Sequence, residues 1–229
     1  MTDFSEKNIL AIDTSTRNLK LAMRFGGDRL VKSEEVVEQS HGRIIFKKID
    51  NLLQSSALNR NQIEAVVVSI GPGSFTGLRI GLAVAKGLAV GLSIPVVGVS
   101  LFELAAFRYR NTEEPITVLT PFRRDEFVSL TINQGRFDLG QAEVVRIEEI
   151  IRMKGENRMI GMGFDARVQF SQVGALPALE TVEFDGADLL YVGVGKLEDE
   201  PLPHISTLEP LYLGKSQAEI RFEQRQAGS

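Results

Sequence analysis

Residues 71–81 read Gly-Pro-Gly-Ser-Phe-Thr-Gly-Leu-Arg-Ile-Gly, between an apolar run at 65–70 and a long apolar segment. This order predicts a buried strand that turns sharply into a helix over 76–92. A Walker loop needs Lys and then Ser or Thr after its last glycine, whereas Leu and Arg follow here. The dinucleotide pattern Gly-x-Gly-x-x-Gly also fails, because a threonine stands at its third glycine position. The motif therefore resembles a phosphate-binding turn without the residues that act on phosphate.

The segments on either side of this motif predict a repeated order of strands and helices. The first half gives strands at 9–13, 19–25, 30–37, 65–70 and 95–99, with helices at 40–54 (N-capped by Ser40), 76–92 and 101–109. The second half gives strands at 116–119, 126–132, 142–145 and 159–162, with helices at 147–153 and 187–197. We therefore predict an α/β fold of duplicated βββαβα units, in which the second half is reduced.

This element order also predicts the domain organisation. We expect one subdomain over residues 1–108 and a degenerate second subdomain over 109–214. The polar residues 215–229 are expected to form a disordered tail.

Composition excludes several classes of site. The 229 residues are 43% hydrophobic and carry a net charge of −4, so we expect no strongly basic surface for nucleic acid. The chain has no cysteine and two histidines, His41 and His204, which excludes a Cys nucleophile, a redox pair and a structural zinc site. We expect His41 to face solvent at a helix start and expect no metal site. No leader is recognised and the apolar segment 80–99 is interrupted by polar residues, so we expect a cytoplasmic protein without a membrane span.

A candidate nucleotide site follows the first predicted strand, at Asp13, Thr14 and Ser15. A carboxylate there can hold hydrated magnesium, and hydroxyls with backbone amides can meet phosphate. The alternative, that these residues only end a strand and cap a turn, stays open. Duplicated βββαβα units with Asp-Thr-Ser-Thr at 13–16 resemble the actin, Hsc70 and sugar kinase-like superfamily, whose two halves close on ATP. The corresponding turn of the second half, 120–125, has no glycine and contains Pro121. Phosphate could there meet Arg123 and Arg124 but no backbone cradle, so a half-built cleft is expected.

A second candidate feature is a stripe of small residues. Gly77, Gly81 and Ala85 recur every four residues on one face of the predicted helix 76–92. Each helical glycine costs about 0.5–1 kcal/mol relative to alanine, so tight packing must offset it. The chain's own preceding helix at 40–54 and a helix of a partner are both open as the neighbour.

The chain resembles the TsaB (YeaZ) family. The resemblance is carried by the segment 9–15, by the glycine motif with Ala-Lys-Gly-Leu-Ala at 85–89, and by Pro-Val-Val-Gly-Val-Ser at 95–100. A closing Glu-Pro-Leu-Tyr-Leu at 209–213 also matches. Pro121 and Phe122 stand where the family tends to have Asp-Ala, and Gly214 stands where Arg is usual. These departures concern the second half.

The resemblance implies an accessory subunit in the threonylcarbamoyl modification of adenosine 37 of tRNA. Its partners would be the homologous catalytic subunit TsaD and the ATPase TsaE, with tRNA as the substrate of the complex. No cofactor would be tightly bound to this subunit, and any ATP or ADP would lie at the interface of the complex. The family also implies a homodimer when the partner is missing.

The same resemblance implies that contacts with TsaD or a second copy use the first two helices. We expect contact or contact-supporting positions at Ile45, Ile49, Leu52, Gly77, Ile80, Gly81, Val84 and Ala85.

No independent activity is expected. TsaD holds a metal with a His-x-x-x-His pair after its corresponding strand, and residues 100–105 here, Ser-Leu-Phe-Glu-Leu-Ala, contain no histidine. Two alternatives remain: an ATP-dependent kinase-like enzyme of the same superfamily, and a glycoprotease-type peptidase, for which no metal or nucleophile constellation is visible.

Overall fold

The computed structural model describes residues 4–37, 41–123, 125–153, 157–164, 179–199, 201–202 and 204–213. Three expectations lie outside the described residues: the N-cap at Ser40, the phosphate contact of Arg124 and the tail at 215–229. The side chain of Arg123 also lies outside this description.

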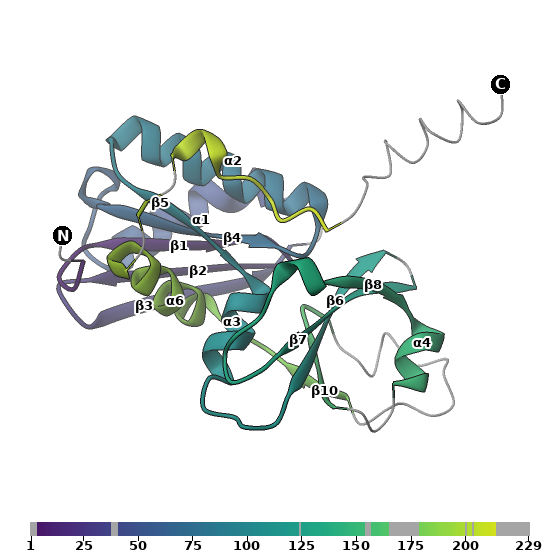
Figure 1. Cartoon of the computed structure of the whole chain (residues 1–229). Coiled ribbons are helices and arrows are strands. Elements are labelled where there is room, and N and C mark those ends of the chain that lie inside the picture. Colours follow the sequence, from purple (N-terminus) through teal and green to yellow (C-terminus); the bar gives the residue numbers. More distant parts are fainter. Residues whose placement is uncertain are drawn as a thin grey trace.

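The first half is a five-stranded sheet in the order β3-β2-β1-β4-β5 (Figure 1). Its strands are β1 (Ile9–Asp13), β2 (Asn18–Phe25), β3 (Arg29–Val36), β4 (Ala65–Gly71) and β5 (Val96–Ser100). Strands β1, β2 and β3 are antiparallel neighbours, and β1, β4 and β5 run parallel. Strands β1 and β5 are buried at every position, as expected of strands covered on both faces. The helices are α1 (His41–Ser55), α2 (Phe75–Leu92) and α3 (Leu101–Arg108).

The second half repeats this topology. Its sheet has the order β10-β9-β6-β7-β8, and its strands are β6 (Ile116–Arg123), β7 (Glu126–Ile132), β8 (Glu143–Arg146), β9 (Arg158–Met162) and β10 (Leu179–Val182). Strands β6, β7 and β8 are antiparallel, and β6, β9 and β10 are parallel, which matches the first sheet strand for strand. The helices are α4 (Ile147–Arg152) and α6 (Gly186–Asp199). The predicted duplication is confirmed: the chain has an α/β fold in which two βββαβα-like units have the same strand order.

The predicted boundary between 108 and 109 does not separate two spatial units. Helix α6 follows the second sheet in sequence but packs on β1, β2, β4 and β5 of the first sheet. One apolar core joins both sheets, α3 and α6. The link into α6 is held by Lys20 on β2, whose Nζ donates to the carbonyl oxygen of Phe184 at 2.6 Å and lies 4.1 Å from that residue's ring centre. The two halves of the sequence therefore share helices and a core.

A second apolar core lies on the other face of the first sheet, beneath α1 and α2. The segment 205–213 returns from α6 to this region, where Leu208 is buried in the same core. The backbone amide of Leu211 donates to the carbonyl oxygen of Ile70 at 2.8 Å, which fixes the segment beside the end of β4. Figure 1 shows it lying next to α2.

Candidate functional site

The glycine motif folds back onto the β1–β2 hairpin. Ser74 is the N-cap of α2, and its Oγ accepts from the amide of Gly77 at 3.2 Å. The amide of Ser74 donates to the carbonyl oxygen of Ser15 at 2.7 Å, and Thr14 Oγ1 donates to the carbonyl oxygen of Gly77 at 2.8 Å. The first turn of α2 and the hairpin are thus held together by hydrogen bonds in both directions.

The glycines of the motif allow this close approach. A Cβ atom at Gly77 would lie under 3.0 Å from the carbonyl oxygen of Thr14, and one at Gly81 would lie as close to Thr14 Oγ1. Real Cβ atoms do not approach other atoms so closely. The neighbour of Gly77 and Gly81 is therefore the hairpin, and both neighbours considered from the sequence, the helix at 40–54 and a partner helix, are wrong for these two positions.

The structure brings the three nucleotide candidates together and buries them. Asp13, Thr14 and Ser15 are at most 2% exposed. Asp13 Oδ1 accepts from the amide of Ser15 at 2.9 Å, which is the side-chain-capped turn held open as the alternative. Asp13 Oδ2 and Ser15 Oγ are buried without a hydrogen-bond partner among the described residues. In this structure these atoms are therefore not accessible to a phosphate group.

The second half has Thr120 at the strand position that corresponds to Asp13, by the matching registers of β1 with β2 and of β6 with β7. Its Oγ1 is also buried without a hydrogen-bond partner in the described parts of the chain. A hydroxyl there cannot supply the negative charge that a magnesium ion requires. Within the described residues no group of three or more His, Cys, Asp or Glu side chains could hold a metal ion.

His41 at the start of α1 is buried rather than solvent-facing, so the expectation from the sequence is wrong. Burial lowers the pKa of His41 below its ordinary value of 6.5, while the nearby Asp13 carboxylate and a hydrogen bond with the Thr16 backbone oppose this shift. Its Nε2 is buried without a hydrogen-bond partner among the described residues, so a proton added there would be poorly solvated.

This burial predicts a pH-dependent stability. Since the pKa of His41 is lower in the folded chain than in the unfolded chain, the unfolded state takes up the proton first as pH falls. We expect the free energy of unfolding to be steady above the ordinary pKa of 6.5 and to decrease as pH falls below it. Urea unfolding at pH 8 to 5 measures this. His41→Gln should reduce the decrease and His204→Gln, at an exposed position, should leave it; equal slopes in all three chains would contradict the prediction.

Most of the predicted interface residues face the chain's own core. Ile45, Ile49 and Leu52 on α1 are 0–3% exposed, and Gly77, Gly81 and Ala85 on α2 are buried as well. Val84 is 8% exposed, and only Ile80 is half-buried. The buried positions therefore face inward, because the apolar spacing that marks a helix face also marks the face that packs on its own sheet. They support the helices from beneath, and their role as contact-supporting positions stays a prediction.

The outward face of α2 carries a different stripe of small residues. Ala83, Gly87 and Gly91 are exposed and recur every four residues. A Cβ atom at Gly87 or Gly91 would meet nothing within 4 Å, so no close approach among the described residues accounts for these glycines. Val90 beside them is 68% exposed. The sequence contained this stripe, but α2 is apolar on nearly every side and the pattern alone did not separate its two faces.

Helix α2 is the one helix of the described residues that is long and apolar enough to cross a membrane. Its inner side accounts for much of that apolarity, since Leu78, Leu82, Ala85 and Ala89 are buried and α2 connects the parallel strands β4 and β5. The outer side supplies the rest. Two apolar faces on one helix therefore explain the composition: one packs on the sheet and one is exposed.

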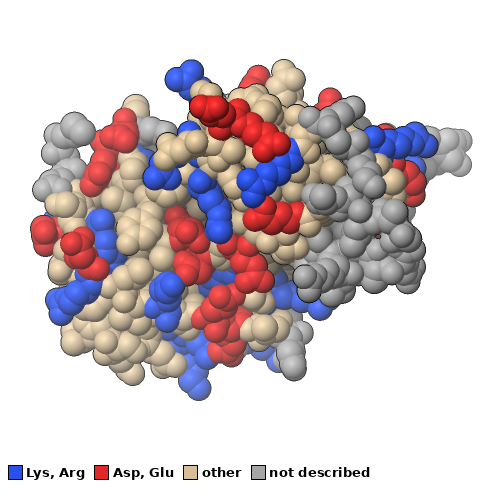
Figure 2. All heavy atoms as spheres, turned by 90° about the horizontal axis from the view of Figure 1, so that it is seen from below, with Lys and Arg blue, Asp and Glu red and all other residues tan. Residues whose placement is uncertain are grey.

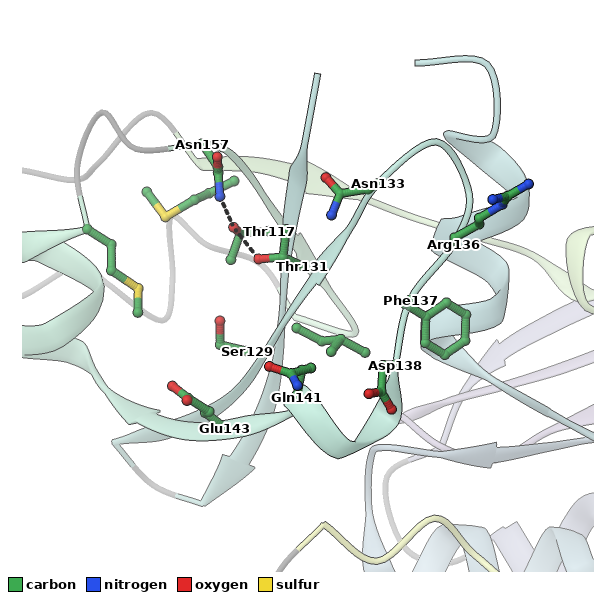
Figure 3. A pocket seen from close by; sticks show the side chains of 13 residues that line it. Thr117, Ser129, Thr131, Asn133, Arg136, Phe137, Asp138, Gln141, Glu143 and Asn157 are labelled. Carbon is green, nitrogen blue, oxygen red and sulfur yellow. Dashed lines mark hydrogen bonds between the residues drawn. The ribbon is translucent and has the colours of Figure 1, made fainter. Parts of the chain in front are cut away.

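The outer face of the second sheet differs in polarity from that of the first. By matching register, Leu10, Leu21 and Met23 of the first half correspond to Thr117, Ser129 and Thr131 of the second. A hollow of about 430 Å³ lies over these hydroxyls, and Figure 3 shows that polar side chains of neighbouring loops surround it. Thr117 and Thr131 share a hydrogen bond at 3.2 Å, and Asn157 donates to Thr117 at 3.4 Å. Beside this hollow, Leu119 and Phe127 of the same face form a small apolar core with Ile150 of α4, which is the counterpart of the larger core beneath α1 and α2.

Two arginines beside the end of α3, a residue type that could contact RNA phosphate, are engaged within the chain. Arg108 donates to the carbonyl oxygen of Glu183 at 3.0 Å, and Arg110 donates to that of Phe107 at 2.6 Å. On the face seen in Figure 2, acidic and basic side chains lie beside one another and form no single large basic patch. That face therefore lacks the continuous positive surface expected of a protein that binds nucleic acid by itself.

Comparisons with known proteins agree with this fold. The family model described as TsaD, tRNA N6-adenosine threonylcarbamoyltransferase, matches residues 31–194. The tRNA threonylcarbamoyladenosine biosynthesis protein TsaB of Haemophilus influenzae is 30% identical over 217 residues, which are 85% of this chain and 92% of the relative. The chain belongs to the TsaB family. The solved structure of YeaZ from Pseudomonas aeruginosa is 26% identical, has a TM-score of 0.71, and is matched over 90% of this chain and 100% of that chain.

The TsaB chain is also related to the transferase family itself. A tRNA N6-adenosine threonylcarbamoyltransferase of Nitratidesulfovibrio vulgaris is 41% identical over 66 residues, which are 29% of this chain and 18% of the transferase. TsaB and the transferase thus share a common ancestor.

Proposed function

We propose that this TsaB chain is a non-catalytic companion subunit that docks the homologous transferase TsaD through the outward face of α2. One observation carries the proposal: Gly87 lies in the interior of α2 and Gly91 in its last turn, both are exposed, and among the described residues a Cβ atom at either position would meet nothing within 4 Å. Glycine in a helix interior, as at Gly87, costs about 0.5–1 kcal/mol relative to alanine. A closely approaching helix of a partner offsets that cost, because small residues let two helix backbones come together.

The exposed apolar side chains support the same face. Phe75 is 40% exposed and Val90 is 68% exposed, at the two ends of α2. Large apolar side chains exposed along one helix are consistent with a protein interaction site. In the described part of the second half, the outer sheet face is polar around Thr117 and Ser129, and its apolar part is covered by Ile150 of α4. We therefore assign docking to the first half alone.

The chemistry is assigned to the partner. Among the described residues no group of three or more His, Cys, Asp or Glu side chains could hold a metal ion, and the carboxylate of Asp13 is buried. This supports a subunit without independent activity more than it supports a kinase-like enzyme or a peptidase. In this proposal the complex also contains the ATPase TsaE, acts on adenosine 37 of tRNA in the cytoplasm, and holds any ATP or ADP at its interface. In the absence of TsaD, a second copy covers the face and forms a homodimer.

The decisive experiment combines purified TsaB chain, TsaD and TsaE with tRNA, ATP and the threonylcarbamoyl donor. We expect modified adenosine when all proteins are present and none from this chain alone. The oligomeric state of the isolated chain is measured by sedimentation in parallel. Transfer by the chain alone, or transfer by TsaD and TsaE at an unchanged rate without it, would refute the proposed role.

A further inference from the structure

The closing motif at 209–213 has no role in the function assigned so far, yet the structure fixes its position. Leu208 just before it is buried in the core beneath α2, and the amide of Leu211 is hydrogen-bonded to β4. Tyr212 directly follows Leu211, and its side chain is 46% exposed. The segment 205–213 therefore places a large aromatic side chain beside the start of α2.

Tyr212 meets two exposed residues of α2. Its ring centre lies 5.4 Å from that of Phe75, with the planes tilted by 39°. The guanidinium carbon of Arg79 lies 3.9 Å from the centre of the Phe75 ring, and Arg79 Nε donates to the Tyr212 hydroxyl at 3.2 Å. Stacking and the hydrogen bond hold all three side chains in one arrangement. We call Phe75, Arg79 and Tyr212 the aromatic-arginine cluster.

The chain's own packing does not account for this cluster. None of its members belongs to the three apolar cores found in the described residues. No ion pair between Arg79 and a described acidic side chain is found, so its charge is not neutralised by one of them. The side chains are thus ordered at the surface without being buried, and their ordering entropy is lost before any partner arrives.

Residue type and place give the cluster a role. Tyrosine and arginine are enriched among the few interface residues that supply most of the binding free energy, and pre-ordered side chains lose less freedom on binding. The cluster begins the exposed face whose later members are Ala83, Gly87 and Val90. A partner helix laid along this face would therefore end against the cluster.

We propose that the aromatic-arginine cluster is the anchor of the TsaD interface, and that Tyr212, brought by the C-terminal segment, is its specificity-determining residue. This inference rests on the proposed function. The partner surface that fits it presents an apolar side chain to the Phe75 ring and a carboxylate to the outer edge of Arg79, where two guanidinium nitrogens besides Nε are available. The cluster thus requires both an apolar side chain and a carboxylate from its partner. A purely apolar face would also accept lipid or a second copy of the chain.

The test compares binding of TsaD by calorimetry for the wild-type chain and four variants. Tyr212→Ala is expected to weaken binding roughly 30-fold, the loss typical of an interface anchor. Tyr212→Phe keeps the ring and loses the hydrogen bond of Arg79, so it should weaken binding by a smaller factor. Arg79→Gln should weaken binding and also flatten its salt dependence. Tyr191 on α6 is 57% exposed, against 46% for Tyr212, and Tyr191→Ala should bind as the wild type does.

Thermal unfolding of each variant is the companion measurement. Because Tyr212 is half exposed, we expect the melting temperature of Tyr212→Ala to stay near that of the wild type. If the wild-type chain does not bind TsaD at all, the proposed function fails. If the wild type binds and Tyr212→Ala and Arg79→Gln bind equally well, or if Tyr191→Ala loses as much affinity as they do, the anchor is wrong while the docking function stands.

Discussion

Gly87→Gln should make the chain more stable and at the same time remove its partner. Glutamine is a good helix former, and a side chain at this position meets nothing within 4 Å, so the free energy of unfolding should rise by about 0.5–1 kcal/mol. The same side chain stands where a partner helix must approach the backbone of α2. Overfilling a packed contact costs about 1–3 kcal/mol, which corresponds to roughly 5- to 150-fold weaker binding of TsaD. Urea unfolding measures the first effect, and calorimetry measures the second.

The chain offers a matched control for this prediction. Gly195 lies in α6, and a Cβ atom there would also meet nothing within 4 Å. Gly195→Gln should therefore give a similar gain in stability without affecting the binding of TsaD. An unchanged affinity of Gly87→Gln would show that the face of α2 is not the docking surface. The same conclusion would follow if Gly87→Gln and Gly195→Gln lost affinity for TsaD to the same degree, because the effect would then not be specific to α2.

Gly77→Ala should lower the free energy of unfolding, whereas Gly87→Gln should raise it, although both changes add a side chain to a glycine of α2. Its Cβ atom would meet the backbone carbonyl oxygen of Thr14, which cannot move without displacing the hairpin. We expect a net loss of about 1–3 kcal/mol in the free energy of unfolding. Gly87→Ala, in open space, should instead gain about 0.5–1 kcal/mol. Urea unfolding of the two variants side by side tests the sign of each change.

Gly81→Ala gives a second check, because its obstacle is a side-chain atom. The Cβ atom would meet Thr14 Oγ1, whereas the remaining atoms of Thr14 lie at ordinary contact distances of 3.5 Å and 3.6 Å. Thr14→Ala removes the obstacle, so the double variant Thr14→Ala with Gly81→Ala should be more stable than the sum of the single changes predicts. Thr14→Ala should not rescue Gly77→Ala, since the carbonyl oxygen stays. If the changes in the free energy of unfolding were additive for Thr14→Ala with Gly81→Ala as well as for Thr14→Ala with Gly77→Ala, the packing described for the glycine motif would be contradicted.

The duplication and most of its elements were predictable from the sequence because they depend on local patterns. Strand β4 is a run of apolar residues, mostly Val, and α2 begins at a glycine-rich turn with Ser74 as its cap. Strand β10 was missed, since Leu-Glu-Thr-Val at 179–182 is short, is only partly buried and reads as a polar segment. It exists because β9 offers it a parallel edge. Such pairing is a property of the assembled sheet, not of the four residues.

The candidate site was predicted less well, and the reason is the same for each of its parts. Gly77 and Gly81 were recognised as positions of close approach, but the sequence does not state which segment approaches them. Ile45 and Ile49 were recognised as one face of α1, but that face packs on the chain's own sheet. The cluster of Phe75, Arg79 and Tyr212 joins residues more than 130 positions apart, and no local pattern links them.

The sequence by itself determined the duplicated α/β units, membership of the TsaB family and the lack of cysteine chemistry. These follow from residue type and from spacing along the chain. Only the tertiary structure decided which side of α2 faces outward, because the helix is apolar on both sides and the competing neighbours lie far away in sequence. The hairpin at Thr14 takes the face of Gly77 and Gly81, and the face of Gly87 and Gly91 is left exposed for a partner.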